Sequence, residues 1–171
     1  SKFHHKKMRI INYLTLCSFF IILVLFNSCT GYKPIFSSNN LNFEISNHTI
    51  SGDRRLGNQL YLKIKKNTQK RETKTSPYNF DMYINISKNK DATVKSSTGK
   101  ILEYNLTLDT NFKINDYLTK EELINSKFVY STSYKVQDKH SDTIKTENIV
   151  IENLMDKIYQ EILIKLTEIT K

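Results

Sequence analysis

The sequence contains no tryptophan, only four glycines and only two cysteines among its 171 residues. Four glycines are too few to build a glycine-rich phosphate-binding loop, so a nucleotide site of that type is excluded. Two cysteines exclude a small scaffold held together by several disulfides. The hydrophobic fraction of 39% is nevertheless sufficient for a packed core, so the chain is not predicted to be disordered throughout.

Catalytic and metal-binding patterns are missing as well. His4 and His5 lie at the N-terminus, and His48 and His140 stand alone in segments predicted as polar loops, so no metal-ligand spacing occurs. No serine, cysteine or aspartate falls in a recognised nucleophile motif. We therefore expect no catalytic residues, no metal and no cofactor, and a protein that is not an enzyme.

Positive charge is in excess but unevenly placed. The formal net charge is +9, from 26 Lys and Arg against 17 Asp and Glu. Residues 1–28 contain four of these basic residues and no acid, so the remainder of the chain has a net charge of +5. Because the N-terminal charges have a separate explanation, the total does not indicate nucleic-acid binding, and no nucleic-acid partner is expected.

Residues 1–28 have the three parts of a secretory signal. A basic head precedes a mostly apolar stretch, Ile10 to Phe26, and Asn27-Ser28 then leads to Cys29. A cysteine at the exit indicates a bacterial lipoprotein signal, although Phe26 stands where leucine is usual. Cleavage before Cys29, diacylation of its thiol and acylation of its new amino group (palmitate or a similar chain) would anchor the chain firmly in a membrane. Met8 is an alternative start.

The membrane expected for this anchor is the outer one, facing the periplasm. In the lipoproteins that the signal resembles, an Asp after the acylated cysteine favours retention in the inner membrane, and Thr30 stands here instead. The alternative is an uncleaved signal-anchor helix, but the 17 residues from Ile10 to Phe26 are at the short limit of the ~17–25 needed to span a bilayer.

Three segments of the mature chain alternate between apolar and polar residues: 78–87, 102–114 and 127–137. Such alternation predicts strands with one buried and one wet face, which is typical of antiparallel sheets. Tyr83 is the one exception within the first segment, because it occupies a position on the polar face. A weaker fourth strand is predicted at Leu41–Ile45.

Two helices are predicted to cover the apolar face of this sheet. The first runs from Arg54 to Lys66, with Ser51, Gly52 and Asp53 before it as cap candidates. Its apolar stripe is Leu56, Leu60 and Ile64. The second runs from about Thr143 to Ile169, with an apolar face of Ile151, Met155, Ile158, Ile162, Leu166 and Ile169, and with Glu147, Glu152, Asp156 and Glu161 expected on the opposite side.

The predicted fold is therefore α+β. It is a two-layer sandwich with a mostly antiparallel four-stranded sheet and both helices on one face, in the order β-α-β-β-β-α. The predicted domains are a signal peptide at 1–28, a lipid-anchored linker at 29–40 and a single domain at 41–171.

Two basic clusters remain on this framework. One extends from the first helix into the next segment, and the other flanks the turn between the second and third strands. Their members are Lys63, Lys65, Lys66, Lys70, Arg71 and Lys74 in the first, and Lys88, Lys90, Lys95 and Lys100 in the second. A solvated lysine surface is one interpretation. Contact with anionic lipid phosphates is the other.

Several short motifs together resemble the LPS-assembly lipoprotein (LptE) family of alphaproteobacteria. The mature chain would open with Cys29-Thr-Gly-Tyr-Lys-Pro-Ile-Phe36, close to the family's Cys-Gly-aromatic-x-Pro-aliphatic-aromatic start, with Thr30 inserted. Further matches are Arg54-Arg-Leu-Gly-Asn-Gln-Leu60, Ser76-Pro-Tyr78, Leu102-Glu-Tyr-Asn-Leu106 and the long final helix.

The resemblance implies a role in binding and assembly rather than in catalysis. Family members partner the LPS-assembly outer-membrane β-barrel (LptD) one to one, aid its folding, and bind lipopolysaccharide on its way to the cell surface. Lys88, Lys90, Lys95 and Lys100 are then the candidate contacts for lipopolysaccharide phosphates. Two alternatives stay open: a periplasmic scaffold or pilotin-type lipoprotein that binds a secretion or cell-wall component, and a signal-anchored ligand-binding domain that keeps residues 1–28.

Overall fold

The computed structural model describes residues 43–68 and 78–170. All of them belong to one unit, which spans 39–171. The predicted signal peptide, the linker 29–40 and Cys29 lie outside the described residues, as do Lys70, Arg71 and Lys74 of the first basic cluster.

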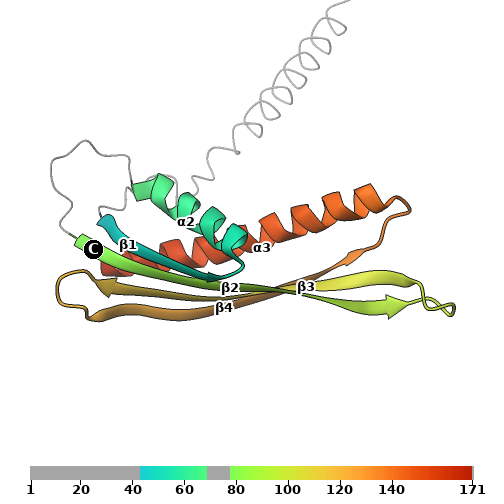
Figure 1. The fold of residues 1–171 in the computed structure, drawn as a ribbon, viewed down its shortest axis with the longest axis horizontal. Helices are drawn as coiled ribbons and strands as arrows, with labels where there is room; N and C mark the ends of the chain where they lie inside the picture. The colour runs from blue at the N-terminus through green and yellow to red at the C-terminus, as the bar shows by residue number, and fades with distance from the viewer. Residues whose placement is uncertain (1–42, 69–77, 171) are drawn as a thin grey trace, which may run out of the picture. The chain divides into compact units, whose positions relative to one another are not determined.

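The described chain forms a four-stranded sheet with two helices on one face (Figure 1). The elements in chain order are β1 (Phe43–Gly52), α2 (Arg54–Thr68), β2 (Tyr78–Lys95), β3 (Ile101–Asp116), β4 (Glu122–Lys135) and α3 (His140–Ile169). This arrangement confirms the predicted order and the two-layer α+β sandwich.

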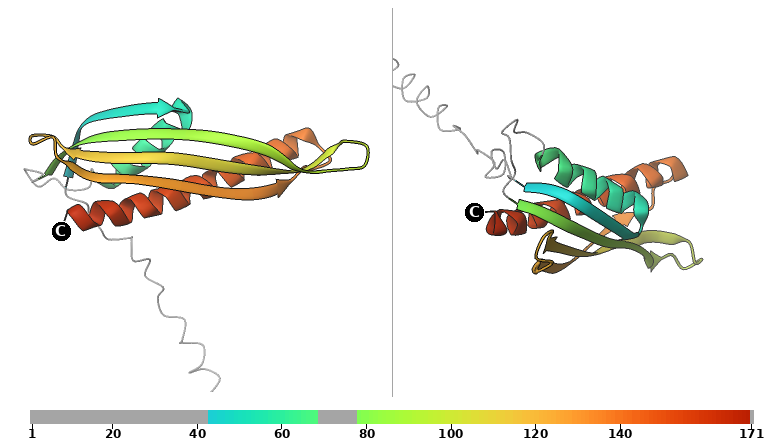
Figure 2. Two further views of the ribbon diagram at one scale, coloured as in Figure 1. Left: turned by 90° about the horizontal axis from the view of Figure 1, so that it is seen from below. Right: turned by 60° about the vertical axis from the view of Figure 1, so that its left-hand side comes forward.

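The strands lie in the order β1-β2-β3-β4, which Figure 2 (left) shows from the side of the sheet opposite the helices. β2, β3 and β4 form an antiparallel meander, whereas β1 pairs with β2 in parallel. A parallel neighbour requires a crossover connection, and α2 lies within it. His48, predicted in a polar loop, lies instead in β1, with its ring stacked 4.0 Å from that of Tyr61 in α2.

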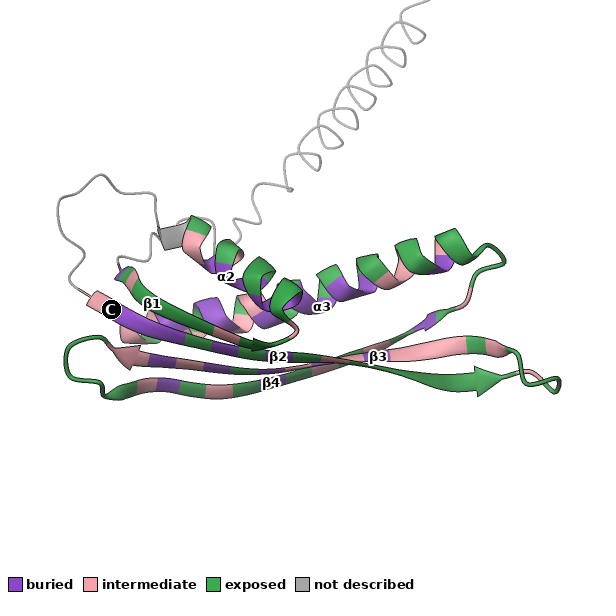
Figure 3. Ribbon diagram, in the orientation of Figure 1, coloured by how far each residue is buried: buried purple, intermediate pink, exposed green. Residues whose placement is uncertain are grey.

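The core lies between the sheet and the helices, where the apolar residues of the strands meet the apolar residues of the helices (Figure 3). Leu56, Leu60 and Ile64 of α2 are fully buried, as the helical spacing predicts. In β2 the alternate residues Phe80, Met82, Ile84 and Ile86 are buried, and β3 contributes Leu106, Leu108, Phe112 and Ile114. α3 closes this layer with Ile151, Met155, Ile158, Ile162 and Leu166, while Ile169 is only partly buried.

The β2–β3 hairpin is longer than the sequence predicts. β2 continues eight residues past Ser87, because β3 pairs with it as far as Lys95 opposite Ile101. β1 ends where Gly52 pairs with Ile86, so the outer half of the hairpin has no neighbour on that side among the described strands. Leu102 of β3, predicted on the buried face, is 42% exposed.

The turn from β1 into α2 depends on Gly52 and Asp53. Gly52 has a φ of +75°, and a Cβ atom built on it would lie 2.1 Å from the carbonyl oxygen of Ile86. The backbone N–H of Asp53 donates to that same oxygen at 2.7 Å, and the Asp53 carboxylate accepts from the N–H of Leu56 at 3.1 Å. Asp53 therefore caps the helix, as predicted, and Gly52 allows the chain to pass close to β2.

Two alanine substitutions separate backbone strain from steric clash. Gly99 also has a positive φ, of +84°, but no atom lies within 4 Å of an added Cβ. We expect Gly99→Ala to lower the free energy of unfolding by about 1 kcal/mol, which is the cost of the left-handed conformation alone. Gly52→Ala should cost at least about 3 kcal/mol, because strain and clash combine. Urea unfolding of both variants measures the difference, and equal losses would contradict the close approach at Gly52.

Candidate functional site

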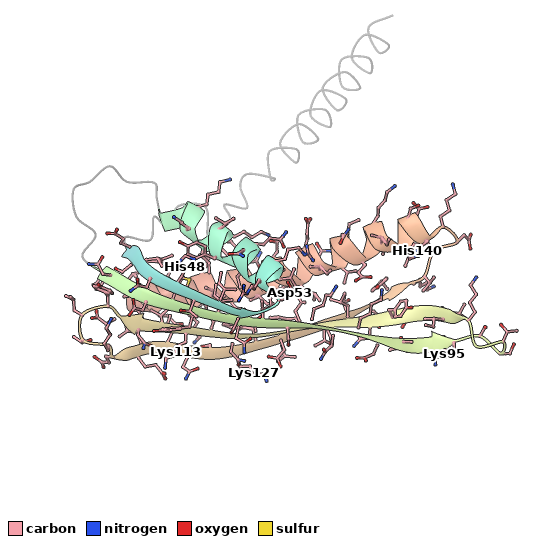
Figure 4. All side chains as sticks on the ribbon, in the orientation of Figure 1. His48, Asp53, Lys95, Lys113, Lys127 and His140 are labelled. Atoms are coloured by element: carbon pink, nitrogen blue, oxygen red, sulfur yellow. The ribbon has the colours of Figure 1, made fainter. Side chains whose placement is uncertain are left out.

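The predicted lysine contacts lie on the outer half of the β2–β3 hairpin, where the structure divides them into two pairs. Lys88 and Lys90 continue the alternation of Ile84 and Ile86, so their side chains lie on the helix side of the sheet. Lys95 is the last residue of β2, and Lys100 closes the turn, where its carbonyl accepts from the N–H of Ser96 at 2.8 Å. Figure 4 shows Lys95 at the far end of the hairpin.

Lys88 and Lys90 share one carboxylate of α3. The Nζ of Lys88 lies 3.4 Å from Oε1 of Glu147, and the Nζ of Lys90 lies 2.5 Å from Oε2. The hydroxyl of Tyr134 donates to the same Oε2 at 2.8 Å. Lys90 also lies over the ring of Tyr104, with its Nζ 4.1 Å from the ring centroid, a distance typical of a cation–π contact. We call these five residues the Glu147 cluster.

Ionisation in the Glu147 cluster reflects a balance of burial and hydrogen bonding. The side chain of Glu147 is 16% exposed, and this burial by itself would raise its pKa. Hydrogen bonds from Lys90 and Tyr134 outweigh it, so the pKa of Glu147 lies below its ordinary value of 4.5. Burial would likewise lower the pKa of Lys90, but its hydrogen bond to Glu147 raises that pKa above 10.5. Both groups are therefore charged at neutral pH.

The cluster engages Lys88 and Lys90 but not Lys95 and Lys100. Lys95 and Lys100 are exposed and form no ion pair with any residue that the structure describes. Lys88 and Lys90 carry two positive charges against the single negative charge of Glu147, so one positive charge of this group is not compensated. Positive charge that no described acid pairs with is thus exposed at the end of the hairpin.

Glu147 is one of the residues that the sequence interpretation placed wrongly. It was expected on the solvent side of the final helix, with Glu152 and Asp156, but it faces the sheet. The signal was present in the spacing, because Glu147 lies four residues after Thr143 and four before Ile151, and both of these are buried. A charged residue on a buried helical stripe indicates a partner on the facing element.

The described part of the first basic cluster lies on α2. Lys63 forms an ion pair with Asp156 of α3, which links the outer surfaces of the two helices. Lys65 lies beside the ring of Tyr61, with its Nζ 5.7 Å from the centroid. The partners of these two lysines, Asp156 and Tyr61, differ from Glu147, the partner of Lys88 and Lys90.

A cluster of metal ligands or a membrane-spanning helix would indicate another kind of site. No group of three or more His, Cys, Asp or Glu side chains within 43–68 and 78–170 is placed to hold a metal ion. Over the same ranges, neither helix combines the length and the apolar character that a bilayer crossing requires.

Comparisons with known proteins identify the fold. No protein-family model and no curated protein matches the chain. Among solved structures, rare lipoprotein B from Shewanella oneidensis superposes with a TM-score of 0.50 and 15% identity, over 73% of this chain and 99% of that one. An uncharacterised lipoprotein B from Nitrosomonas europaea gives 0.51 and 13%, over 77% and 87%. At these identities the likeness concerns the fold, which this chain shares with bacterial lipoproteins.

Removal of the Glu147 charge tests whether the Glu147 cluster stabilises the fold. We expect Glu147→Gln to lower the free energy of unfolding at pH 7 by about 1–2 kcal/mol, because three charged or polar partners lose a charged acceptor. The matched control is Glu152→Gln, an exposed residue of the same helix, which should change stability by less than about 0.5 kcal/mol.

The same variants also test how the free energy of unfolding depends on pH. Because the folded-state pKa of Glu147 is lowered, its contribution is present above the ordinary carboxyl pKa and is lost as the pH falls through the lowered value. Wild type and Glu152→Gln should therefore lose more stability between pH 6 and pH 3 than Glu147→Gln does. Parallel acid profiles for all three proteins would show that the cluster does not stabilise the fold.

Proposed function

We propose that this chain is a lipid-anchored outer-membrane lipoprotein that partners the LPS-assembly β-barrel and binds lipopolysaccharide during its delivery to the cell surface. The observation that carries the proposal is the β-α-β-β-β-α sandwich, which is shared with two bacterial lipoproteins. The sequence adds an independent feature, since Cys29 follows a signal-like segment and precedes the folded unit by fewer than fifteen residues.

The membrane anchor is attributed to acylated Cys29. Two or three acyl chains on one cysteine would hold the chain at a bilayer surface. The 13 residues between Cys29 and Phe43 span at most about 50 Å when fully extended, at ~3.3–3.6 Å per residue. The sandwich would therefore remain close to the membrane and to any barrel embedded in it.

A binding role accords with the chemistry of the hairpin end. Lipopolysaccharide carries phosphates, and Lys95 and Lys100 present charges that no described acid neutralises. We assign the phosphate contact to these two lysines first. Lys88 and Lys90 would contribute to the field around them while Glu147 holds their side chains in place. No catalytic role is included in the proposal.

Affinity purification tests the barrel partnership. The full chain, tagged at its C-terminus and purified from outer membranes, should recover one large β-barrel protein at a one-to-one ratio. Cys29→Ser provides the control for the anchor, because the unacylated chain should be absent from the outer-membrane fraction. Recovery of a secretion or cell-wall component without a barrel would instead support the scaffold or pilotin-type alternative.

Charge reversal tests the phosphate contact. The double variant Lys95→Glu/Lys100→Glu should weaken lipopolysaccharide binding at least about tenfold, since each cation near an anionic surface contributes about 1 kcal/mol. The control is Lys66→Glu/Lys157→Glu, which makes the same change in charge on the exposed surface of the two helices. Equal binding by the two double variants, measured by titration at fixed ionic strength, would remove these lysines from the site.

A further inference from the structure

The face of the sheet opposite the helices is polar and is not covered by any described element (Figure 2). Its residues are mainly amides and hydroxyls rather than charges. They include Asn85, Ser87 and Asn89 of β2, and Asn105, Thr107 and Asn111 of β3. Tyr83 is the large aromatic residue on this face and is 39% exposed. We call this surface the open face.

Charges in the middle of the open face are neutralised in pairs. Lys127 of β4 lies 2.9 Å from Asp109 of β3, and Lys113 of β3 lies 2.6 Å from Glu122 of β4. Figure 4 shows both lysines on the side of the sheet away from the helices. Although the chain as a whole is strongly basic, this surface therefore presents little net charge. An ion would gain little electrostatic energy by binding there, whereas an uncharged polar ligand would meet no unfavourable electrostatic field.

A shallow depression of about 230 Å³ lies in the middle of the open face. Its lining includes Thr49, Tyr83, Asn85, Asn111, Lys113 and Asn125, so all four strands contribute. Tyr83 pairs directly with Lys113, and Asn85 with Asn111, while Lys113 pairs with Asn125 on the next strand. Side chains directly opposite one another in a sheet lie about 5 Å apart at Cβ, so these groups form a compact grid.

Two of the amides in this grid have no partner in the described part of the chain. The side chains of Asn85 and Asn111 form no hydrogen bond with any residue that the structure describes. Each amide offers two N–H donors and one carbonyl acceptor, and the two stand side by side across β2 and β3. At the edge of the depression, the amide of Asn125 is already held by Glu122 at 3.1 Å. Asn85 and Asn111 are thus the two lining amides that no described side chain or backbone group engages.

We propose that this depression binds a segment of uncharged glycan through Tyr83, Asn85 and Asn111. Neighbouring hydroxyls of a sugar ring both donate and accept hydrogen bonds, and paired amides complement that pattern. The exposed ring of Tyr83 provides a surface on which the C–H face of a sugar can stack, because the face of an aromatic ring is electron-rich. The volume suits one sugar ring and is below the ~300–1,000 Å³ of pockets for drug-sized ligands.

Other ligand classes fit this surface less well. An apolar molecule would remove the two amides from water without replacing their hydrogen bonds, which is unfavourable. A phosphate would compete with Glu122 for Lys113, the one cation of the lining. The glycan site lies on the opposite side of the sheet from the Glu147 cluster, and it does not depend on the proposed barrel partnership.

Saturation-transfer NMR on the full chain, in a zwitterionic detergent without sugar groups, tests this site. Three probes distinguish the sources of glycan: maltohexaose, the polysaccharide released from lipopolysaccharide and dephosphorylated, and peptidoglycan disaccharide fragments. We expect at least one probe to show saturation of its ring C–H protons at millimolar concentration. The absence of transfer to all three would overturn the proposal.

Alanine variants locate the contact. Asn85→Ala and Asn111→Ala should each weaken binding of the responding probe about threefold to tenfold, the effect of one or two lost hydrogen bonds. Tyr83→Ala should reduce it by at least as much, with the C–H saturation pattern lost. Asn89→Ala, an exposed amide of the same strand and face outside the depression, is the control and should bind as wild type does.

The thermal stability of all four variants should stay close to wild type, because their side chains are exposed. If Asn89→Ala weakens binding as strongly as Asn111→Ala, the depression is not the site. Recovery of the barrel protein with the Asn111→Ala variant is measured in parallel. This measurement distinguishes a failure of the glycan-site proposal from a failure of the proposed barrel partnership.

Discussion

Burial of one face of a long sheet is the constraint on which the rest of the structure depends. β2 has 18 residues and β1 only ten, so α2 and β1 close the sandwich over the inner half of the hairpin alone. The 30 residues of α3 span about 45 Å at 1.5 Å per residue and reach beyond that enclosure. Along α3 the contact with the sheet therefore changes from Ile158 and Ile162, in the apolar core, to Glu147, in an ionic contact with Lys88 and Lys90.

The sequence predicted the enclosed half well, because there a single physical rule applies. Where both layers are apolar, spacing determines the buried side, and Leu56, Leu60 and Ile64 of α2 follow it. The rule becomes ambiguous where polar residues occupy buried positions. Glu147 has the spacing of a core residue but the charge that is typical of a surface residue. Lys88 is also charged, so the apolar pattern stops there although β2 continues. Thr110 is similar, since it is fully buried while its hydroxyl has no partner among the described residues.

The candidate sites were predictable only in part, for a related reason. Residue type identified the hairpin lysines, but it could not show that a carboxylate distant in sequence holds two of them and leaves Lys95 and Lys100 exposed. The grouping of residues on the open face depends on the pairing register between the strands. Asn85 and Asn111 come together only because β2 and β3 pair as they do, and the one sequence signal was Tyr83, an aromatic residue on a polar strand face. Along the outer half of the hairpin, the helix side of the sheet thus forms an ionic contact with α3, whereas the middle of the open face presents little net charge.

The parallel pairing of β1 with β2 has a consequence for the order of folding. Asn47 of β1 bonds to Asp81 of β2 across 34 residues, whereas the two hairpins of the meander close through short turns. Closing a longer loop costs more chain entropy before any contact compensates for it. We expect the meander to form early and β1 with α2 to dock late. This delay would leave the β1 side of β2 transiently unpaired during folding, and such an edge is exposed to association with other chains until α2 closes the crossover.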